Sequence, residues 1–283
     1  MNKWLTLLIK KVFWCCTGVV CLYAEMNAQG ESNSFGLQKI NTKLAQHQSL
    51  FNHLNPAIIV DVQQPILALA IENLFRIQYL NRYHVGFQYP GFNGTLNLSY
   101  SSLTWTNNFY LRKYSFSFSR KAGSRLTLGT GINGVIAGIG SLGRISTFTV
   151  DVGGAWSISD KMVMGAFLNN PSPFVFKLNT ESMVPAQLGV NMVLFPADKL
   201  YLELLLFKDL EFNPSLNLLV HYIFSEYSFI RAGVSGSPLS NYFGLGCQYQ
   251  NWLVLFKSEF DSVLGVSSGI SLFYYADGHV ANN

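Results

Sequence analysis

The sequence predicts an all-β protein, a transmembrane antiparallel β-barrel of about 14 strands, and three observations support this fold class. First, apolar residues alternate with small or polar ones in segments of about 10 residues across the range 65–275. Second, charged residues make up only 12% of the chain, against about 25% in an average soluble domain. Third, aromatic residues gather near the segment ends, as they do at the interfacial girdles of membrane barrels.

Composition and charge exclude several other classes of protein. The chain has 283 residues, 49% of them apolar, and a formal net charge of only +4. Disorder, coiled coils and nucleic-acid binding all need a denser charge than this. We therefore expect no nucleic-acid partner.

The N-terminus has the pattern of a secretory signal peptide. Lys3, Lys10 and Lys11 precede an uncharged run over residues 12–24, and a small residue, Ala28, follows at a plausible cleavage site. The uncharged run is shorter than the ~20 residues of a spanning helix. We predict a signal peptide over 1–28; the alternative is an uncleaved anchor that begins at Trp4.

Removal of the signal peptide would leave Cys247 as the one cysteine of the mature chain. A single thiol makes no intramolecular disulfide, and no Cys/His spacing typical of a metal site remains. We expect no metal and no cofactor.

The remaining elements follow in order. Residues 29–64 are polar and mixed, with no clean period, and Pro56 interrupts them near their end. Strand-like segments then lie near residues 66–75, 81–89, 94–104, 109–119, 125–136, 145–157, 161–169, 185–195, 199–208, 213–224, 227–235, 241–250, 252–261 and 265–275. Residues 276–283 form a C-terminal tail. One domain, the barrel, follows over 65–275.

The alternation assigns side chains to the two faces of the wall. In the second segment, Arg82, His84 and Gln88 oppose a face of Tyr, Val and Phe residues, and Asp151 lies on the polar face of the sixth segment. Charges are costly toward lipid, so these four residues are candidates for the lumen. A secreted soluble β-sandwich is the alternative, but its outward face would carry more charge.

Short motifs carry a resemblance to a known family. They are Asn55-Pro56-Ala57, Glu72-Asn73-Leu74-Phe75, Asn169-Asn170-Pro171, residues 208–214, Arg231-Ala232-Gly233-Val234 and Leu264-Gly265-Val266. On these motifs the chain resembles the FadL-like outer-membrane barrels, and more closely the Bacteroidota barrels related to the PorV type. The resemblance implies about fourteen strands and an N-terminal hatch, here residues 29–64, with Asn55, Pro56 and Ala57 packed in the lumen. FadL-like transporters have larger loops than this sequence, however.

The resemblance also implies a function. It suggests an outer-membrane channel that binds or passes small hydrophobic molecules and is surrounded by outer-membrane lipid. The alternative is an accessory or scaffold barrel of a Bacteroidota secretion (type IX) or envelope complex, whose loops would dock an envelope protein partner. The short loops favour this alternative.

The residues themselves give no sign of an enzyme. His84 and the serines near it lack a nucleophile motif such as an outer-membrane phospholipase would need. We therefore predict no catalytic residues. Asn169, Asn170 and Pro171 open the longest connection between strands, and they are the candidates for a functional surface loop.

Overall fold

The computed structural model describes residues 54–59, 64–105, 109–139, 143–171, 184, 186–209, 213–236 and 239–276. The predicted signal peptide, most of the predicted hatch and all but Ala276 of the predicted tail lie outside these residues. The one helical element described is η2 (Pro56–Ile59), a single 3-10 turn. None of the helical structure described has the length and hydrophobicity that a membrane crossing requires.

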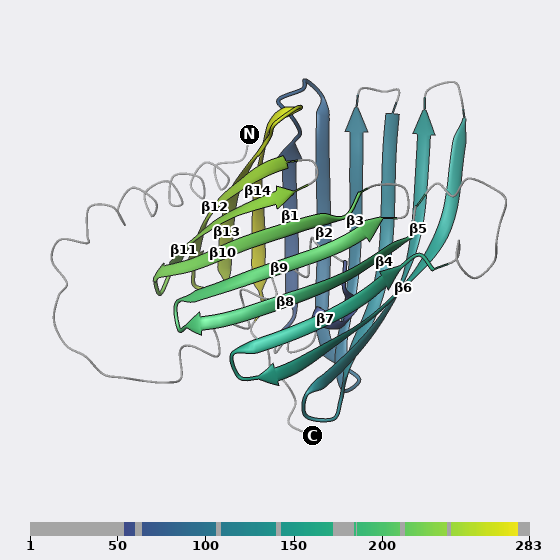
Figure 1. Ribbon diagram of the computed structural model, residues 1–283. Helices are drawn as coiled ribbons and strands as arrows, with labels where there is room; N and C mark the ends of the chain where they lie inside the picture. Colours follow the sequence, from purple (N-terminus) through teal and green to yellow (C-terminus); the bar gives the residue numbers. More distant parts are fainter. Residues whose placement is uncertain are drawn as a thin grey trace, which may run out of the picture. The chain divides into compact units, whose positions relative to one another are not determined.

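Fourteen strands form one closed antiparallel barrel, which confirms the predicted fold class (Figure 1). Each strand pairs with the next one along the chain, and the last pairs with the first. The strands are β1 (Ile66–Asn73), β2 (Leu80–Gly91), β3 (Gly94–Trp105), β4 (Phe109–Ala122), β5 (Leu126–Ile139), β6 (Arg144–Ser159), β7 (Met162–Asn169), β8 (Gln187–Ala197), β9 (Leu200–Asp209), β10 (Ser215–Ser225), β11 (Ser228–Gly236), β12 (Leu239–Tyr249), β13 (Trp252–Asp261) and β14 (Gly265–Tyr275).

Barrel closure removes the one alternative fold that the alternation allowed. The ladder between β1 and β14 runs from Ile66 opposite Tyr275 to Asn73 opposite Ser268. A two-sheet sandwich has open sheet edges, whereas here every strand has two neighbours. The soluble β-sandwich is therefore excluded.

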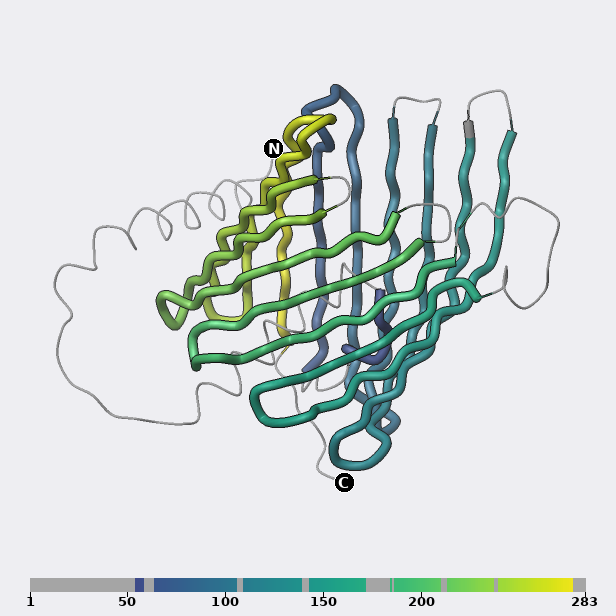
Figure 2. The backbone as a smooth tube through the Cα atoms, in the orientation of Figure 1, coloured from purple at the N-terminus to yellow at the C-terminus, as the bar shows by residue number. Residues whose placement is uncertain are grey.

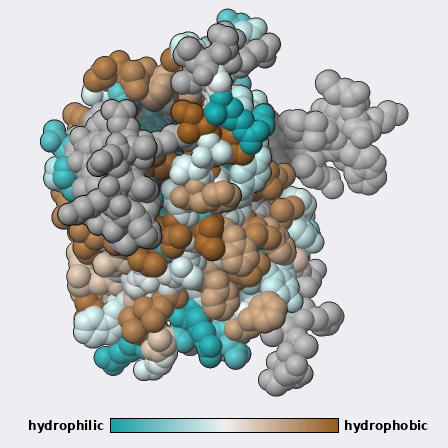
Figure 3. Space-filling model, turned by 90° about the vertical axis from the view of Figure 1, so that its right-hand side faces the viewer, coloured by the Kyte–Doolittle hydropathy of each residue, from teal (hydrophilic) through white to brown (hydrophobic). Residues whose placement is uncertain are grey.

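The wall has an apolar outer face, and its inner face combines small and polar residues with one cluster of apolar side chains. In β1, Leu67, Leu69 and Ile71 are exposed on the outside, while the residues between them are buried inside. Because side chains alternate along a strand, one apolar stripe per strand adds up to an apolar outer wall. Figure 3 shows such side chains across the middle of one face, with hydrophilic residues gathered at its lower rim.

The two ends of the barrel differ in their connections. At the end where β1 begins and β14 ends, tight turns join the strands. Phe92 and Asn93, between β2 and β3, have φ of 55° and 57°, as a type I′ hairpin turn requires. At the other end several connections are longer, and the longest joins β7 to β8. Short turns at one end and longer loops at the other are typical of outer-membrane barrels.

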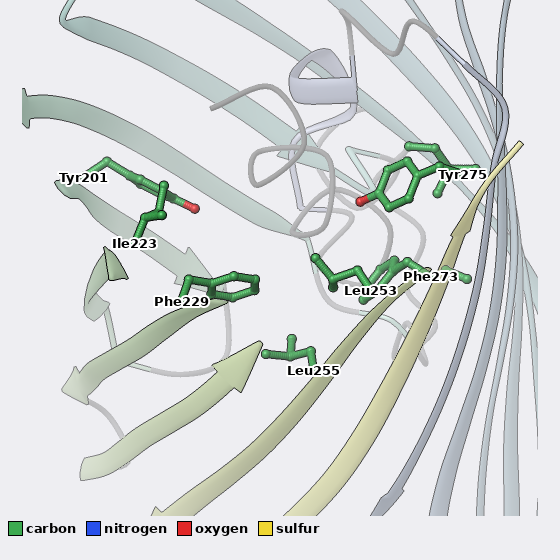
Figure 4. Close-up of a cluster of buried hydrophobic side chains, with 9 residues drawn as sticks. Tyr201, Ile223, Phe229, Leu253, Leu255, Phe273 and Tyr275 are labelled. Carbon is green, nitrogen blue, oxygen red and sulfur yellow. The ribbon is translucent and has the colours of Figure 1, made fainter. Parts of the chain in front are cut away.

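Buried apolar side chains cluster inside the barrel, near the end that has the tight turns. This apolar cluster contains Ile66, Ala68, Tyr201, Ile223, Phe229, Leu253, Leu255, Phe273 and Tyr275. Figure 4 shows its labelled members projecting inward and toward one another from β9, β10, β11, β13 and β14. The apolar core of this protein thus lies in the lumen.

Candidate functional site in the barrel lumen

The 55–57 segment (Asn55, Pro56, Ala57) lies against the inner wall. Asn55 Nδ2 donates to Gly154 O at 3.2 Å and to Asn191 Oδ1 at 3.1 Å, and Asn55 Oδ1 accepts from Ala57 N at 2.9 Å. Residues of η2 contact β4, β5, β6 and β7, and Figure 2 shows this short segment, in dark purple, beside those strands. Asn55 thereby joins the segment to two strands, β6 and β8.

Three glycines of the wall leave room for this segment. A Cβ at Gly129 would overlap the backbone of Pro56 and Ala57, and one at Gly153 would overlap Asn55 Oδ1. A Cβ at Gly165 would lie 2.7 Å from Asn55 Nδ2. These strand glycines therefore permit a close backbone approach, which is a common reason for glycine inside a strand.

The structure brings two of the predicted candidates together at the start of the longest connection. Asp151, which is 5% exposed, accepts hydrogen bonds from Asn133 Nδ2 at 2.6 Å and from the Asn170 backbone N–H at 3.3 Å. Asn170 has φ of 48°, and its side chain donates to Val184 O. The same Asn170 N–H also donates to Val150 O at 2.9 Å, so the Asp151 carboxylate adds to a backbone bond at the turn by which the chain leaves β7. Asn169 ends β7 and is buried beside this turn.

A row of inward-facing residues, polar except for two glycines, crosses the barrel wall from β9 to β2. The strand register places its members directly opposite one another on successive strands. In order, this polar row consists of Tyr201, His221, Arg231, Gly244, Lys257, Gly269, Glu72 and Arg82. At its β9 end, the rings of Tyr201 and His221 stack with centroids 4.1 Å apart.

Glu72 is the centre of charge pairing in the polar row. Its carboxylate forms an ion pair with Lys257 Nζ on one side and lies 3.5 Å from Arg82 Nη1 on the other. Gly269 stands between Glu72 and Lys257, and a Cβ there would lie 2.8 Å from Glu72 Cγ and 3.2 Å from Lys257 Cε. The absent side chain therefore allows the ion pair to cross β14.

The remaining candidates from the sequence lie in different parts of the wall. Gln88 is fully buried opposite Ile66, close to the apolar cluster. His84 lies opposite Ala70, between Gln88 and the polar row. Pro171 follows Asn170 on the way out of β7. These residues do not converge on a single site.

Sequence reasoning missed two central members of the polar row, Glu72 and Arg231. Both occur in the short motifs that carried the family resemblance, but no role was assigned to either. A local signal did exist for Glu72. Glu72 lies two residues after Ala70, on the same face of β1 as Ala68 and Ala70, and this face is turned to the lumen.

A cavity of about 250 Å³ opens on the inner wall over the strands from β9 to β14. Its charged lining residues are Glu203, Arg231, Lys257 and Glu259, and Tyr242 adds a hydroxyl. Ser240 Oγ donates to Glu259 Oε1 at 2.9 Å. Two carboxylates and two cations thus line one small space.

The cavity and the apolar cluster adjoin each other. Leu255 lines the cavity and is also a member of the cluster. The Arg231 guanidinium carbon lies 5.1 Å from the ring centroid of Phe229, another member of the cluster. The lumen therefore offers a polar region and an apolar region side by side.

No protein-family model matches this sequence, and no curated protein matches it. Solved structures do match. The monoaromatic hydrocarbon channel CymD is 13% identical with a TM-score of 0.60, over 82% of this chain and 93% of its own. The Pseudomonas putida toluene transporter TodX is 10% identical with a TM-score of 0.60, over 80% and 93%. A Pseudomonas aeruginosa FadL homologue is 13% identical with a TM-score of 0.53, over 80% and 93%.

At such low identities the likeness concerns the fold. The matches cover about four fifths of this chain and nearly the whole of each solved structure. The chain therefore has the closed fourteen-stranded barrel fold of the FadL-type channels.

Proposed function

We propose that the protein is an outer-membrane channel that binds or passes small hydrophobic molecules. The observation that carries this proposal is the apolar cluster in the lumen, next to a cavity. A barrel that conducts water-soluble molecules has a polar interior. Here nine buried apolar residues of the inner wall form one cluster instead.

Two further observations support the proposal. Solved structures with this fold include channels for monoaromatic hydrocarbons and a toluene transporter. The apolar outer wall suits a lipid environment, and the N-terminus has the pattern of an export signal. Both observations support an outer-membrane location. By analogy with other outer-membrane barrels, the end with tight turns would face the periplasm.

We further propose that residues 29–64 act as a hatch, whose attachment to the wall is the 55–57 segment. Its two hydrogen bonds to the wall and its close contacts with three wall glycines support a fixed attachment at this point. Arg82, His84, Gln88 and Asp151 would line the path through the barrel. The scaffold role in a type IX secretion or envelope complex is the alternative, and the similar structures do not favour it over a channel.

Two experiments test this function. On a gel of the outer-membrane fraction, the unboiled protein should migrate faster than the boiled protein, as a folded barrel does. Intact cells that make the protein should then take up labelled ethylbenzene faster than cells that lack it, and uptake of a hydrophilic solute of similar mass should not change. Recovery of the protein only from the soluble periplasm, or equal uptake of ethylbenzene by both cells, would contradict the proposal.

A further inference from the structure

Arg231 has features that point to a ligand. It lines the cavity, only 4% of it is exposed, and its guanidinium interacts with the hydroxyls of Tyr201 and Tyr242, while its Nε and Nη2 atoms have no hydrogen-bond partner among the described residues. A buried donor without a partner is costly, and more so when it is charged. These two atoms form one side of the guanidinium fork, which suits an oxygen acceptor. An oxygen atom of a ligand in the cavity would satisfy them.

The surrounding charges argue against a charged ligand head. The polar row and the cavity together hold three carboxylates and three cations, namely Glu72, Glu203 and Glu259 with Arg82, Arg231 and Lys257. The formal charges cancel, and Lys257 is already paired with Glu72. A carboxylate or an ammonium group would therefore add an unbalanced charge to a partly desolvated site, which is unfavourable.

A neutral hydroxyl fits these groups better. Its oxygen can accept from Arg231, and its proton can be donated to a carboxylate such as Glu203 or Glu259, which line the same cavity. The apolar body of such a molecule would extend past Leu255 onto the apolar cluster. A volume of about 250 Å³ lies just below the ~300–1,000 Å³ of drug-sized sites. The ligand should therefore be small.

We propose that the cavity binds the hydroxyl group of a small uncharged amphiphile, such as an alkylphenol or a short alcohol, with Arg231 as the hydrogen-bond donor. This inference rests on the proposed function and narrows its substrate class. It distinguishes such amphiphiles both from pure hydrocarbons and from amphiphilic acids.

The test compares four ligands of nearly equal size on the purified full chain in nonionic detergent. They are para-ethylphenol, ethylbenzene, para-ethylbenzoate and para-ethylbenzylamine, titrated at pH 7 by calorimetry with ligand-into-micelle blanks subtracted. We expect para-ethylphenol to bind at least about 10-fold more tightly than the other three. Only its hydroxyl can both accept from Arg231 and donate to a carboxylate of the cavity. Equal or tighter binding of any of the other three would overturn the inference.

Variants then test the role of Arg231. Arg231→Met should weaken para-ethylphenol binding by about 10- to 100-fold and leave ethylbenzene unaffected, and Arg231→Lys should restore part of the loss. Arg112→Met, on the outer wall, is the matched control. Unchanged para-ethylphenol binding by a folded Arg231→Met variant would contradict the proposal. If this variant fails to fold, the order of the four affinities on the unmodified chain still tests the proposal.

The outcomes also separate this inference from the proposed function. If cells take up ethylbenzene, and the purified chain binds ethylbenzene as tightly as para-ethylphenol, the channel is upheld and the hydroxyl site is refuted. Arg231-dependent phenol binding without uptake of any hydrophobic molecule would uphold the site and refute the channel.

Discussion

Replacing Gly153 by alanine tests whether the wall is shaped to hold the 55–57 segment. The new Cβ would overlap Asn55 Oδ1 and lie 3.0 Å from Pro56 Cδ, so the segment has to move. Movement endangers the hydrogen bonds of Asn55 to Gly154 O and Asn191 Oδ1, and the bond from Ala57 N to Asn55 Oδ1. At about 1 kcal/mol for each of the two bonds to the wall, we expect the docking of the segment to weaken by about 2 kcal/mol.

The neighbouring residue, Gly154, provides a matched control on the same strand. Its added Cβ would point to the opposite side of the wall and meet Leu128 Cδ2 at 3.7 Å and Thr127 O at 3.8 Å, which are ordinary contacts. Gly154→Ala should therefore change the docking free energy by less than about 0.5 kcal/mol. Comparison of the two variants separates the effect of a clash with the 55–57 segment from any general effect of alanine in β6.

Hydrogen exchange at the backbone amides of Ala57 and Ile58 reports on the docking, because undocking exposes this part of the chain to water. Both amides donate within the segment, to Asn55 Oδ1 and to Asn55 O respectively. A loss of about 2 kcal/mol corresponds to exchange that is about 30-fold faster. Equal exchange rates in Gly153→Ala and Gly154→Ala would refute the reasoning, since the glycine at 153 would then have no role in seating the segment.

Three other substitutions have expected outcomes. Glu72→Gln should lower the free energy of unfolding in urea by about 1–3 kcal/mol, since two half-exposed cations lose their partner; an unchanged midpoint and slope would contradict this. Asp151→Asn should speed hydrogen exchange at the Asn170 amide by about 2- to 10-fold, because the amide keeps its bond to Val150 O, and a rate like that of the unmodified chain would count against a role for the carboxylate. Val150→Lys, on the outer wall, should cost about 2–4 kcal/mol when the barrel refolds into lipid vesicles, whereas Leu264→Lys, in a turn, should cost less than about 1; equal costs would argue against a lipid-facing wall.

The fold could be predicted because its signal is local. A strand that faces lipid on one side needs an apolar residue at every second position, so Leu67, Leu69 and Ile71 suffice to assign both faces of β1. The largest differences from the predicted boundaries occur where the alternation weakens. Residues 137–139 extend β5 although small residues interrupt their pattern, because the neighbouring strands supply the hydrogen bonds.

The candidate site could be predicted only in part, because it depends on contacts between distant residues. Alternation alone assigned Arg82 to the lumen. Its proximity to Lys257, however, results from the pairing of β1 with β14 and from the register of each ladder between them. Nothing in the sequence around Gly269 shows that its missing side chain makes room for an ion pair. The anchoring of Asn170 by Asp151 depends on register in the same way.

The ion pair across β14 has a consequence for the lifetime of the barrel. Glu72 belongs to the first strand and Lys257 to the thirteenth, so the two can meet only after the last strand has closed the ring. Contacts that exist only in the closed ring must be broken before the ring can open. The Glu72–Lys257 contact therefore stabilises the seam between β1 and β14 and opposes the opening of the barrel.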